Sequence, residues 1–384
     1  MTVNVIGIGE VAPFSTPGER TALDLMTDAG RAAVLDTGLD LQGVDGLLVA
    51  PLVAGAPIAA AGRVAGIMGL HPRYLDIVDL GGATACAMVG RASAAIEAGL
   101  CQAVLCVLAE NVDPSSFYRP GPRWPGDPEV EFERPYGAAM GNSGYALVAQ
   151  RHAYEHGTTD LQRATVAVQQ RQNAQLHPTA LYRDRELTVE DVLASPLVAD
   201  PLHLLEIVRP CSGAIAFVVA SADLADPAGP PAVAVAGYAE RFGHNLLSEA
   251  SSLTTFAIQD TASRAFDTSG IGPDNVDLVS VYDCYTITVI ITLEDAGFCR
   301  KGDGGPFVAE RTFRHDGDLP LNTHGGQLSY GQAGVAGGAT HLLEAIVQLR
   351  ADAGARQVPN CEHAFVHGNG GLLSEQVSLV LRRT

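Results

Sequence analysis

Short apolar runs alternate with longer amphipathic segments along most of the chain. The runs are rich in valine, isoleucine, leucine and alanine, and they cover residues 3–10, 44–51, 103–110, 213–221, 232–240, 276–283, 364–371 and 376–383. Runs of this kind are typical of strands that are buried on both faces of a sheet. Between them, segments such as 21–38 and 337–354 repeat their apolar residues at three and four positions, which predicts helices. We therefore expect an α/β fold whose sheets are covered by helices.

The order of these elements occurs twice. Landmark residues recur at matching places in the two halves: Gly38, Val44 and Asp45 against Gly270, Val276 and Asp277, and the pair Gly81 and Gly82 against Gly325 and Gly326. Two blocks in the same order indicate a duplicated βα unit, and residues 225–232 have the Pro- and Gly-rich composition of a linker between the copies. We expect residues 1–111 and 201–228 to form the N-terminal half and residues 229–384 to form the C-terminal half.

Residues 112–200 belong to neither copy. They hold the only tryptophan of the chain, Trp124, within a stretch that is rich in proline and glycine. Loops that shape a substrate site often have this character, so we expect an inserted loop domain that caps the site.

Composition narrows the possible partners. The net charge of −19 argues against a nucleic-acid surface, which needs clustered positive charge, and a 47% hydrophobic content with 17% charged residues is that of a globular protein. The apolar stretch 46–70 contains prolines, glycines and an arginine, so we do not expect a membrane helix. The seven cysteines are scattered and never form a CxxC pair, which fits a reducing cytoplasm.

Four segments resemble the thiolase superfamily, and in particular its sterol-carrier-protein-like branch. Residues 177–221 are similar to the segment that leads into that branch's Gly-Ala strand, 281–299 to its His-Asp-Cys-Phe segment, 322–334 to its Gly-Gly…Gly-His-Pro loop, and 366–371 to its terminal His/Cys–Gly loop. The resemblance covers nearly the whole chain. It implies a thiolase fold with duplicated βαβαβαββ halves in a five-layered αβαβα core, and a homodimer.

The sequence departs from this family at its catalytic positions. The place of the nucleophilic cysteine falls on Gly82, and Cys86 lies one helical turn further on, where we interpret it as a packed thiol. Gln332 replaces the histidine of Gly-His-Pro, and Tyr282 stands where thiolases carry an Asn or His of their oxyanion hole. Only His367 keeps a position that the sterol-carrier branch uses. Without a thiolate, a covalent acyl-enzyme is not expected.

Retro-aldol cleavage is related chemistry that needs no cysteine. It requires a base for a β-hydroxyl group, hydrogen-bond donors for the thioester enolate and an acid for its carbon. A Schiff base is disfavoured because the single lysine, Lys301, lies in a polar loop that we read as surface, and we expect no metal site. We predict Tyr282 and Tyr330 as the acid/base pair, with Tyr282 taking the hydroxyl proton, and His324 and His367 as oxyanion donors or proton relays. We expect no cofactor beyond the coenzyme A of the substrate.

Further residues of the same loops are predicted to bind the substrate. They are the polar and glycine positions of the four family-like segments and of the first glycine turn: Gly82, Asp283, Gly325, Gly326, Gln332, Asn369 and Gly370. Alternatives stay open for several of them. Either tyrosine could simply pack against the sheet, Gln332 could be a neutral filler, and Asp283 could anchor local hydrogen bonds. Tyr285 is expected in the core, because three residues along a strand place it on the other face from Tyr282.

The resemblance also suggests a substrate and a partner. Lipid-transfer-protein-like aldolases of steroid-degrading bacteria lack the cysteine, cleave a 17-hydroxy-20-carboxyl-CoA steroid to a 17-ketosteroid and propionyl-CoA, and work with a small OB-fold protein, a domain-of-unknown-function type, in a heterotetramer. Two other functions are weighed against this one. The chain could be a sterol-carrier-type thiolase or acyltransferase that uses another thiol, or a non-catalytic subunit that binds acyl-CoA or lipid.

Overall fold

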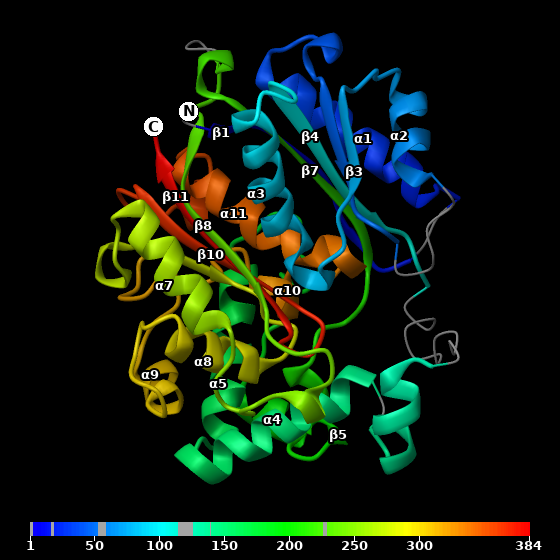
Figure 1. Ribbon diagram of the computed structural model, residues 1–384. Helices are drawn as coiled ribbons and strands as arrows, with labels where there is room; N and C mark the ends of the chain where they lie inside the picture. The colour runs from blue at the N-terminus through cyan, green and yellow to red at the C-terminus, as the bar shows by residue number, and fades with distance from the viewer. Residues whose placement is uncertain (1–2, 17–18, 53–58, 114–125, 139, 226–228) are drawn as a thin grey trace.

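The computed structural model describes residues 3–16, 19–52, 59–113, 126–138, 140–225 and 229–384 (Figure 1). Trp124 and most of the Pro- and Gly-rich stretch around it lie outside these residues. The fold is a mixed α/β fold built on one nine-stranded sheet, whose strands follow the order β3-β2-β4-β7-β1-β8-β11-β10-β9. No helix among the described residues is long and apolar enough to cross a membrane.

The two halves of the sheet have the same internal order. The first half contains β1 (Val3–Phe14), β2 (Gly46–Val49), β3 (Tyr74–Ile77), β4 (Ala103–Glu110) and β7 (Ser212–Ser221), and the second contains β8 (Val233–Phe242), β9 (Leu278–Val281), β10 (His363–Gly370) and β11 (Glu375–Arg383). The second half has no full counterpart of β3 among the described residues. A single parallel bridge between Val279 and Leu321 stands in its place. The halves join where β1 pairs with β8 at Asn4 and Val5.

Helices and sheet halves form five layers, as the family resemblance predicted. The helices that cover the sheet are α1 (Ala22–Thr37), α2 (Ala60–Met68), α3 (Thr84–Glu97), α7 (Ile258–Ser269), α8 (Thr286–Asp295) and α11 (Ala339–Leu349). Helices α1 and α2 pack on the outer face of the first half, and α7 and α8 on the outer face of the second. Helices α3 and α11 lie between the halves, and their apolar residues form the central core.

Local sequence signals explain where α1 begins and ends. Thr21 caps its first turn in a reciprocal capping box with Asp24, and Gly38 ends it in the left-handed conformation with φ of 73°. Leu25 and Ala29 on its inner face are fully buried against the sheet. The helical period predicted for residues 21–38 therefore matches a helix that covers one face of the sheet.

The segment between β4 and β7 packs mainly on the second half. It contains α4 (Met140–His156), α5 (Asp160–Ala174), α6 (Val189–Ala194) and the hairpin of β5 (Leu197–Ala199) and β6 (Leu202–His203). Helix α5 contacts α8, the short helix α9 (Gly304–Glu310) and the single turn α10 (Gly326–Ser329). Figure 1 shows this segment at the lower end of the molecule. It thus covers the loops that follow β9 and precede α11.

Candidate functional site

Gly82 and Tyr282 occupy the same small space at the start of α3. The chain turns at Gly81, with φ of 52°, and α3 begins two residues after Gly82. A Cβ placed on Gly82 would lie 2.2 to 2.4 Å from the ring atoms and the hydroxyl oxygen of Tyr282. The phenol of Tyr282 therefore fills the space that any side chain at position 82 would take. Glycine is required there because of this contact.

Tyr282 is held at the end of β9 by the neighbouring strand. Its backbone N–H donates to the carbonyl of His367 on β10 at 3.0 Å, and its side chain is buried. The Gln332 amide nitrogen donates to the Tyr282 hydroxyl at 3.5 Å. Burial raises the pKa of this hydroxyl, and hydrogen bonds from Gln332 and Gln327 oppose the rise only in part. The phenol is therefore protonated in the free protein and is placed to donate a hydrogen bond.

Asp283 anchors the glycine turn rather than facing a cavity. Its carboxylate accepts the backbone N–H groups of Gln327 at 2.8 Å and Leu328 at 3.2 Å, which begin α10. The same carboxylate lies 3.1 Å from His341 Nε2 on α11. A Cβ on Gly326, where φ is 58°, would lie 2.0 Å from Asp283 Oδ2. The anchoring role that we weighed for Asp283 agrees with this geometry.

Gly325 serves the same turn as its neighbour Gly326. Its φ of 105° is a conformation that favours glycine, and a Cβ there would lie 2.5 Å from the Cβ of Ala174 at the end of α5. The two glycines thus let α5 and the Asp283 carboxylate approach the backbone closely. Their contribution to the site is a compact scaffold.

The end of β10 lies beside the turn that carries Gly82. A Cβ on Gly370 would meet the carbonyl of Leu80 at 2.1 Å, and Asn369 donates its amide N–H to the Tyr145 hydroxyl on α4 at 3.0 Å. His367 is completely buried, with Nδ1 at 2.9 Å from Ser378 Oγ and Nε2 at 2.8 Å from Gln376 Oε1. Since burial lowers the pKa of His367 to about 4, the ring is neutral. Both of its nitrogens are engaged, so in this geometry it positions the strand end and does not reach into the site.

Tyr330 points away from Tyr282. The Tyr330 hydroxyl donates to the carboxylate of Glu10 on β1. Ring contacts of 6.2, 5.1 and 5.5 Å lead from Tyr282 through His341 and His324 to Tyr330, so two imidazole rings stand between the phenols. The prediction that both tyrosines act at one reacting centre is therefore not met by this geometry, because the turn of α10 directs Tyr330 to the β1 side of α11.

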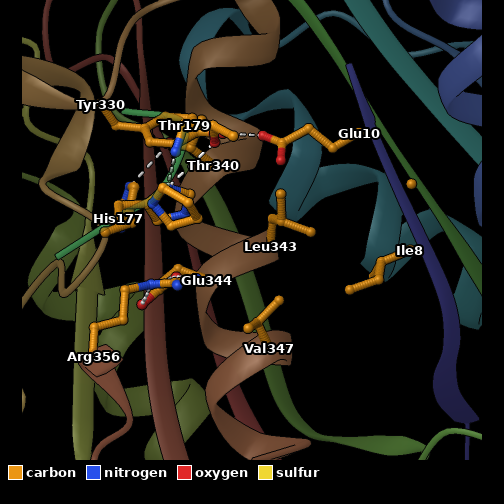
Figure 2. Close-up of a pocket in the computed structure, with 13 residues that line it drawn as sticks. Ile8, Glu10, His177, Thr179, Tyr330, Thr340, Leu343, Glu344, Val347 and Arg356 are labelled. Atoms are coloured by element: carbon orange, nitrogen blue, oxygen red, sulfur yellow. Dashed lines mark hydrogen bonds and ion pairs between the residues drawn. The ribbon is translucent and has the colours of Figure 1, made fainter. Parts of the chain in front are cut away.

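Tyr330 and His324 instead line a separate cavity of about 330 Å³, which we call the β1–α11 cavity (Figure 2). It lies between β1, the loop at residues 177–179 and α11. Its walls are Ile8, Gly9, Glu10, His177, Pro178, Thr179, His324, Tyr330, Thr340, Leu343, Glu344, Val347 and Arg356. Neither Gly82 nor Tyr282 belongs to this lining. The candidate residues thus divide into a Gly82–Tyr282 site and the β1–α11 cavity.

Sequence reasoning missed several of these residues. Glu10 ends the first apolar run and offered no motif, and His177 was noted only as part of a family-like segment. His341 has the periodicity of a helix residue and belongs to no motif, although it contacts Asp283 and lies beside Tyr282. Tyr145 of the insertion stacks on Tyr285 at 4.2 Å, and Tyr285 is buried as predicted. No local signal in the sequence reveals these pairings, because each joins distant segments.

Cys86, Cys284 and Lys301 are not free nucleophiles in this structure. Burial raises the pKa of Cys86 and of Cys284 to about 12, so both thiols are protonated near neutral pH. Lys301 is exposed, as expected for a surface loop, and forms ion pairs with Glu294 at 3.0 Å and Asp295 at 2.6 Å. Its amine is held by those carboxylates.

Comparisons with known proteins agree with the fold. Residues 239–383 match the family described as thiolase C-terminal domain-like. An acetyl-CoA acetyltransferase of Methanothermobacter thermautotrophicus is 32% identical over 96% of both chains. A steroid side-chain-cleaving aldolase of Thermomonospora curvata is 30% identical over 86% of this chain and 88% of its own. A 17-hydroxy-3-oxo-4-pregnene-20-carboxyl-CoA lyase of Mycobacterium tuberculosis is 30% identical over 96% of both chains.

Solved structures extend the likeness to the whole fold. The Ltp2-ChsH2(DUF35) aldolase superposes with a TM-score of 0.89 at 27% identity, over 100% of this chain and 98% of the other. A monomeric SCP2-thiolase-like protein of Mycobacterium smegmatis, at 19% identity and a TM-score of 0.77, shares the fold. These three relatives, at 30% to 32% identity, align over 86% or more of this chain. The chain therefore belongs to the thiolase superfamily.

Proposed function

We propose that this protein cleaves a β-hydroxyacyl-CoA by a retro-aldol reaction without forming an acyl-enzyme. The observation that carries the proposal is the contact between Gly82 and Tyr282, which puts a phenol where an acyl-accepting thiol would have to stand. The steroid side-chain-cleaving aldolase and the 17-hydroxy-3-oxo-4-pregnene-20-carboxyl-CoA lyase among the relatives support this reaction class. No cofactor is required by the chemistry.

Tyr282 carries the proton in the proposed reaction. The bond between Cα and Cβ breaks, its electron pair forms the thioester enolate, and the β-hydroxyl becomes a carbonyl. The Tyr282 oxygen takes the hydroxyl proton while its own proton passes to Cα, so the phenol is unchanged at the end and propionyl-CoA or another acyl-CoA leaves. A raised pKa suits this relay because the phenol never has to exist as a free phenolate.

Donors around Tyr282 can stabilise the enolate oxygen. The Gln332 amide already reaches the Tyr282 hydroxyl, and α3 begins two residues after Gly82. Preorganised donors and the positive end of a helix favour the negative charge that develops on a thioester oxygen. We assign Gln332 to this role. Because Tyr330 lies with Glu10, we assign both proton transfers to Tyr282 instead of dividing them between two tyrosines.

The substrate and partner that we propose follow the relatives. A 17-hydroxy-20-carboxyl-CoA steroid, giving a 17-ketosteroid, is the substrate, and a DUF35-type OB-fold protein is the partner, as in the Ltp2-ChsH2(DUF35) aldolase. A homodimer would pair the edge strands β3 of two copies. The exposure of Leu75 and Ile77 on this edge strand, at 44% each, supports such pairing. Two dimerised chains with two partner chains make the heterotetramer.

The experiment is to incubate the purified chain with a 17-hydroxy-20-carboxyl-CoA steroid, with and without a DUF35-type protein encoded beside it. We expect equal amounts of 17-ketosteroid and propionyl-CoA, and faster turnover with the partner. A thiolase would instead consume free coenzyme A and label a cysteine, and the acetyltransferase among the relatives makes this the competing function. Product that forms only when free coenzyme A is added, or binding without any product, would reject the proposal.

A further inference from the structure

The β1–α11 cavity is built from polar groups at its closed end and apolar groups along its side. Pro178 and Thr179 are exposed at its mouth, while Tyr330 and His324 are each 2% exposed at its inner end. Figure 2 shows the imidazole rings gathered beneath Tyr330, with Leu343 and other apolar side chains on the opposite side. The proposed reaction at Tyr282 uses none of these groups.

The hydrogen bonds of His324 fix its tautomer. The Thr340 hydroxyl donates its one hydrogen to the carbonyl of Gly337 at 2.8 Å. His324 Nε2, at 3.3 Å from Thr340 Oγ1, must therefore be the donor of that contact and carry the hydrogen of the ring. Burial lowers the pKa of His324 well below its usual value, so Nδ1 carries no hydrogen. Among the described residues Nδ1 has no partner, and it is a buried lone pair that lacks a donor.

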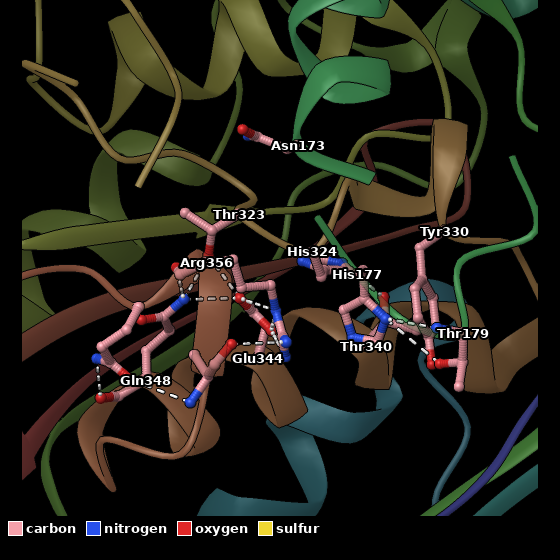
Figure 3. Close-up of polar contacts among 12 residues, drawn as sticks. Asn173, His177, Thr179, Thr323, His324, Tyr330, Thr340, Glu344, Gln348 and Arg356 are labelled. Atoms are coloured by element: carbon pink, nitrogen blue, oxygen red, sulfur yellow. Dashed lines mark hydrogen bonds and ion pairs between the residues drawn. The ribbon is translucent and has the colours of Figure 1, made fainter. Parts of the chain in front are cut away.

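His177 offers a hydrogen-bond donor, whereas His324 offers an acceptor. Its Nδ1 accepts the backbone N–H of Thr179 at 3.3 Å, which places the ring hydrogen on Nε2 (Figure 3). Burial lowers the pKa of His177 to about 4, so the ring is neutral. The ring meets the Tyr330 ring edge-on at 4.8 Å, and the His324 ring meets it at 5.5 Å. The acceptor His324 Nδ1 and the donor His177 Nε2–H therefore belong to rings that both contact the Tyr330 phenol.

Charges around the cavity favour a neutral ligand. Arg356 is neutralised by Glu344 at 2.8 Å, as Figure 3 shows, and therefore offers no free charge to an anion. Glu10 accepts the Tyr330 hydroxyl, and burial raises the pKa of Glu10. A carboxylate or phosphate would meet the Glu10 carboxyl and would find no unpaired cation among the lining residues.

We propose that the β1–α11 cavity is a second ligand site that binds a small, neutral, mainly apolar molecule carrying a hydroxyl group. The hydroxyl donates to His324 Nδ1 and accepts from His177 Nε2–H, while Ile8, Leu343 and Val347 contact the apolar body. A volume of about 330 Å³ lies at the low end of ligand pockets and is too small for a coenzyme A thioester. The site is separate from Gly82 and Tyr282, and it does not depend on the proposed reaction.

The test is calorimetric titration of the whole protein with cyclohexanol, and with methylcyclohexane and cyclohexanecarboxylate as matched probes. We expect cyclohexanol to bind about tenfold more tightly than methylcyclohexane, because roughly one good hydrogen bond contributes this difference in affinity. We expect cyclohexanecarboxylate not to bind. The substitution Val347→Phe should abolish cyclohexanol binding by filling the cavity, and His324→Leu should remove the preference for the hydroxyl. Turnover at Tyr282 should persist in Val347→Phe.

A matched control and clear contrary results complete the design. Leu35→Phe adds a ring at a position that is 82% exposed on α1, and it should leave cyclohexanol binding unchanged. Unfolding curves of each variant identify any that fail to fold. Equal affinity for cyclohexanol and methylcyclohexane, or cyclohexanol binding that survives Val347→Phe in a folded variant, overturns the proposal. So does the absence of any cyclohexanol binding to the wild-type protein.

Discussion

Replacing Tyr282 with phenylalanine isolates the phenolic hydroxyl from the ring that carries it. The ring fills the space over Gly82, so Tyr282→Phe keeps this packing and removes one oxygen. The hydrogen bond that is lost, from the Gln332 amide, is long at 3.5 Å. Since an ordinary intramolecular hydrogen bond contributes about 0.5–1.5 kcal/mol, we expect stability to fall by at most about 1 kcal/mol.

The expected effect on catalysis is much larger than the effect on stability. A positioned acid/base group contributes roughly 10²- to 10⁴-fold to the rate, which corresponds to about 3–5 kcal/mol of barrier. The assay is release of propionyl-CoA from a 17-hydroxy-20-carboxyl-CoA steroid by the chain with its partner, measured as kcat and KM. We expect Tyr282→Phe to lower kcat by this factor with little change in KM, because the hydroxyl acts in the transition state.

Tyr285→Phe is the matched control for this experiment. Tyr285 is also buried, stacks on Tyr145, and donates its hydroxyl to Asn142 at 2.6 Å, three residues along the chain from Tyr282. We expect a stability loss of about 1 kcal/mol and turnover within a few-fold of wild type. Wild-type kcat in Tyr282→Phe, or the same large loss in both variants, would refute the role assigned to the Tyr282 hydroxyl.

Three further predictions follow from the same geometry. Gly82→Ala places a methyl group against the Tyr282 ring, so urea unfolding should show a loss of about 1–3 kcal/mol in the free energy of unfolding. Turnover should fall as well, and an unchanged unfolding curve would contradict the contact. Although burial opposes ionisation, the Arg356 guanidinium lowers the pKa of Glu344 to about 2, from an ordinary value of about 4.3. This depressed pKa contributes about 3 kcal/mol to the free energy of unfolding, which is present above pH 5 and is lost as the pH falls towards 2. Glu344→Gln should remove this pH-dependent stability, whereas Asp184→Asn at an exposed ion pair should leave it unchanged. Cys86→Ala should retain full turnover, since its thiol is buried and protonated, and loss of activity without loss of structure would favour a thiol mechanism.

Much of the fold could be predicted from the chain, because its evidence is periodic and local. Runs of β-branched residues and helical spacing predict covered strands, and the duplication indicated by the sequence agrees with the equivalent strand order of the two sheet halves. The position of Tyr282 also followed from its motif, since it directly succeeds a buried strand. These features depend on neighbours in the sequence.

The course of the loop at residues 322–334 could not be predicted in the same way. Tyr330 leaves a single helical turn, and the direction of its side chain depends on contacts with β1, where Glu10 lies 320 residues away in the sequence. His341 has the pattern of a helix residue, yet it touches Asp283 because α11 passes between the sheet halves. A local pattern does not specify which distant segment completes such a pair, so the β1–α11 cavity emerged only from the structure.

The most direct test of the central claim is the mass of the intact protein during turnover. The wild-type chain with its partner is mixed with a 17-hydroxy-20-carboxyl-CoA steroid, quenched in acid within the first turnovers, and measured by mass spectrometry beside a product assay. We predict propionyl-CoA in the product pool and a protein of unmodified mass at every time. An acyl group on any cysteine that forms and decays at the rate of turnover would contradict carbon–carbon cleavage by the Tyr282 phenol.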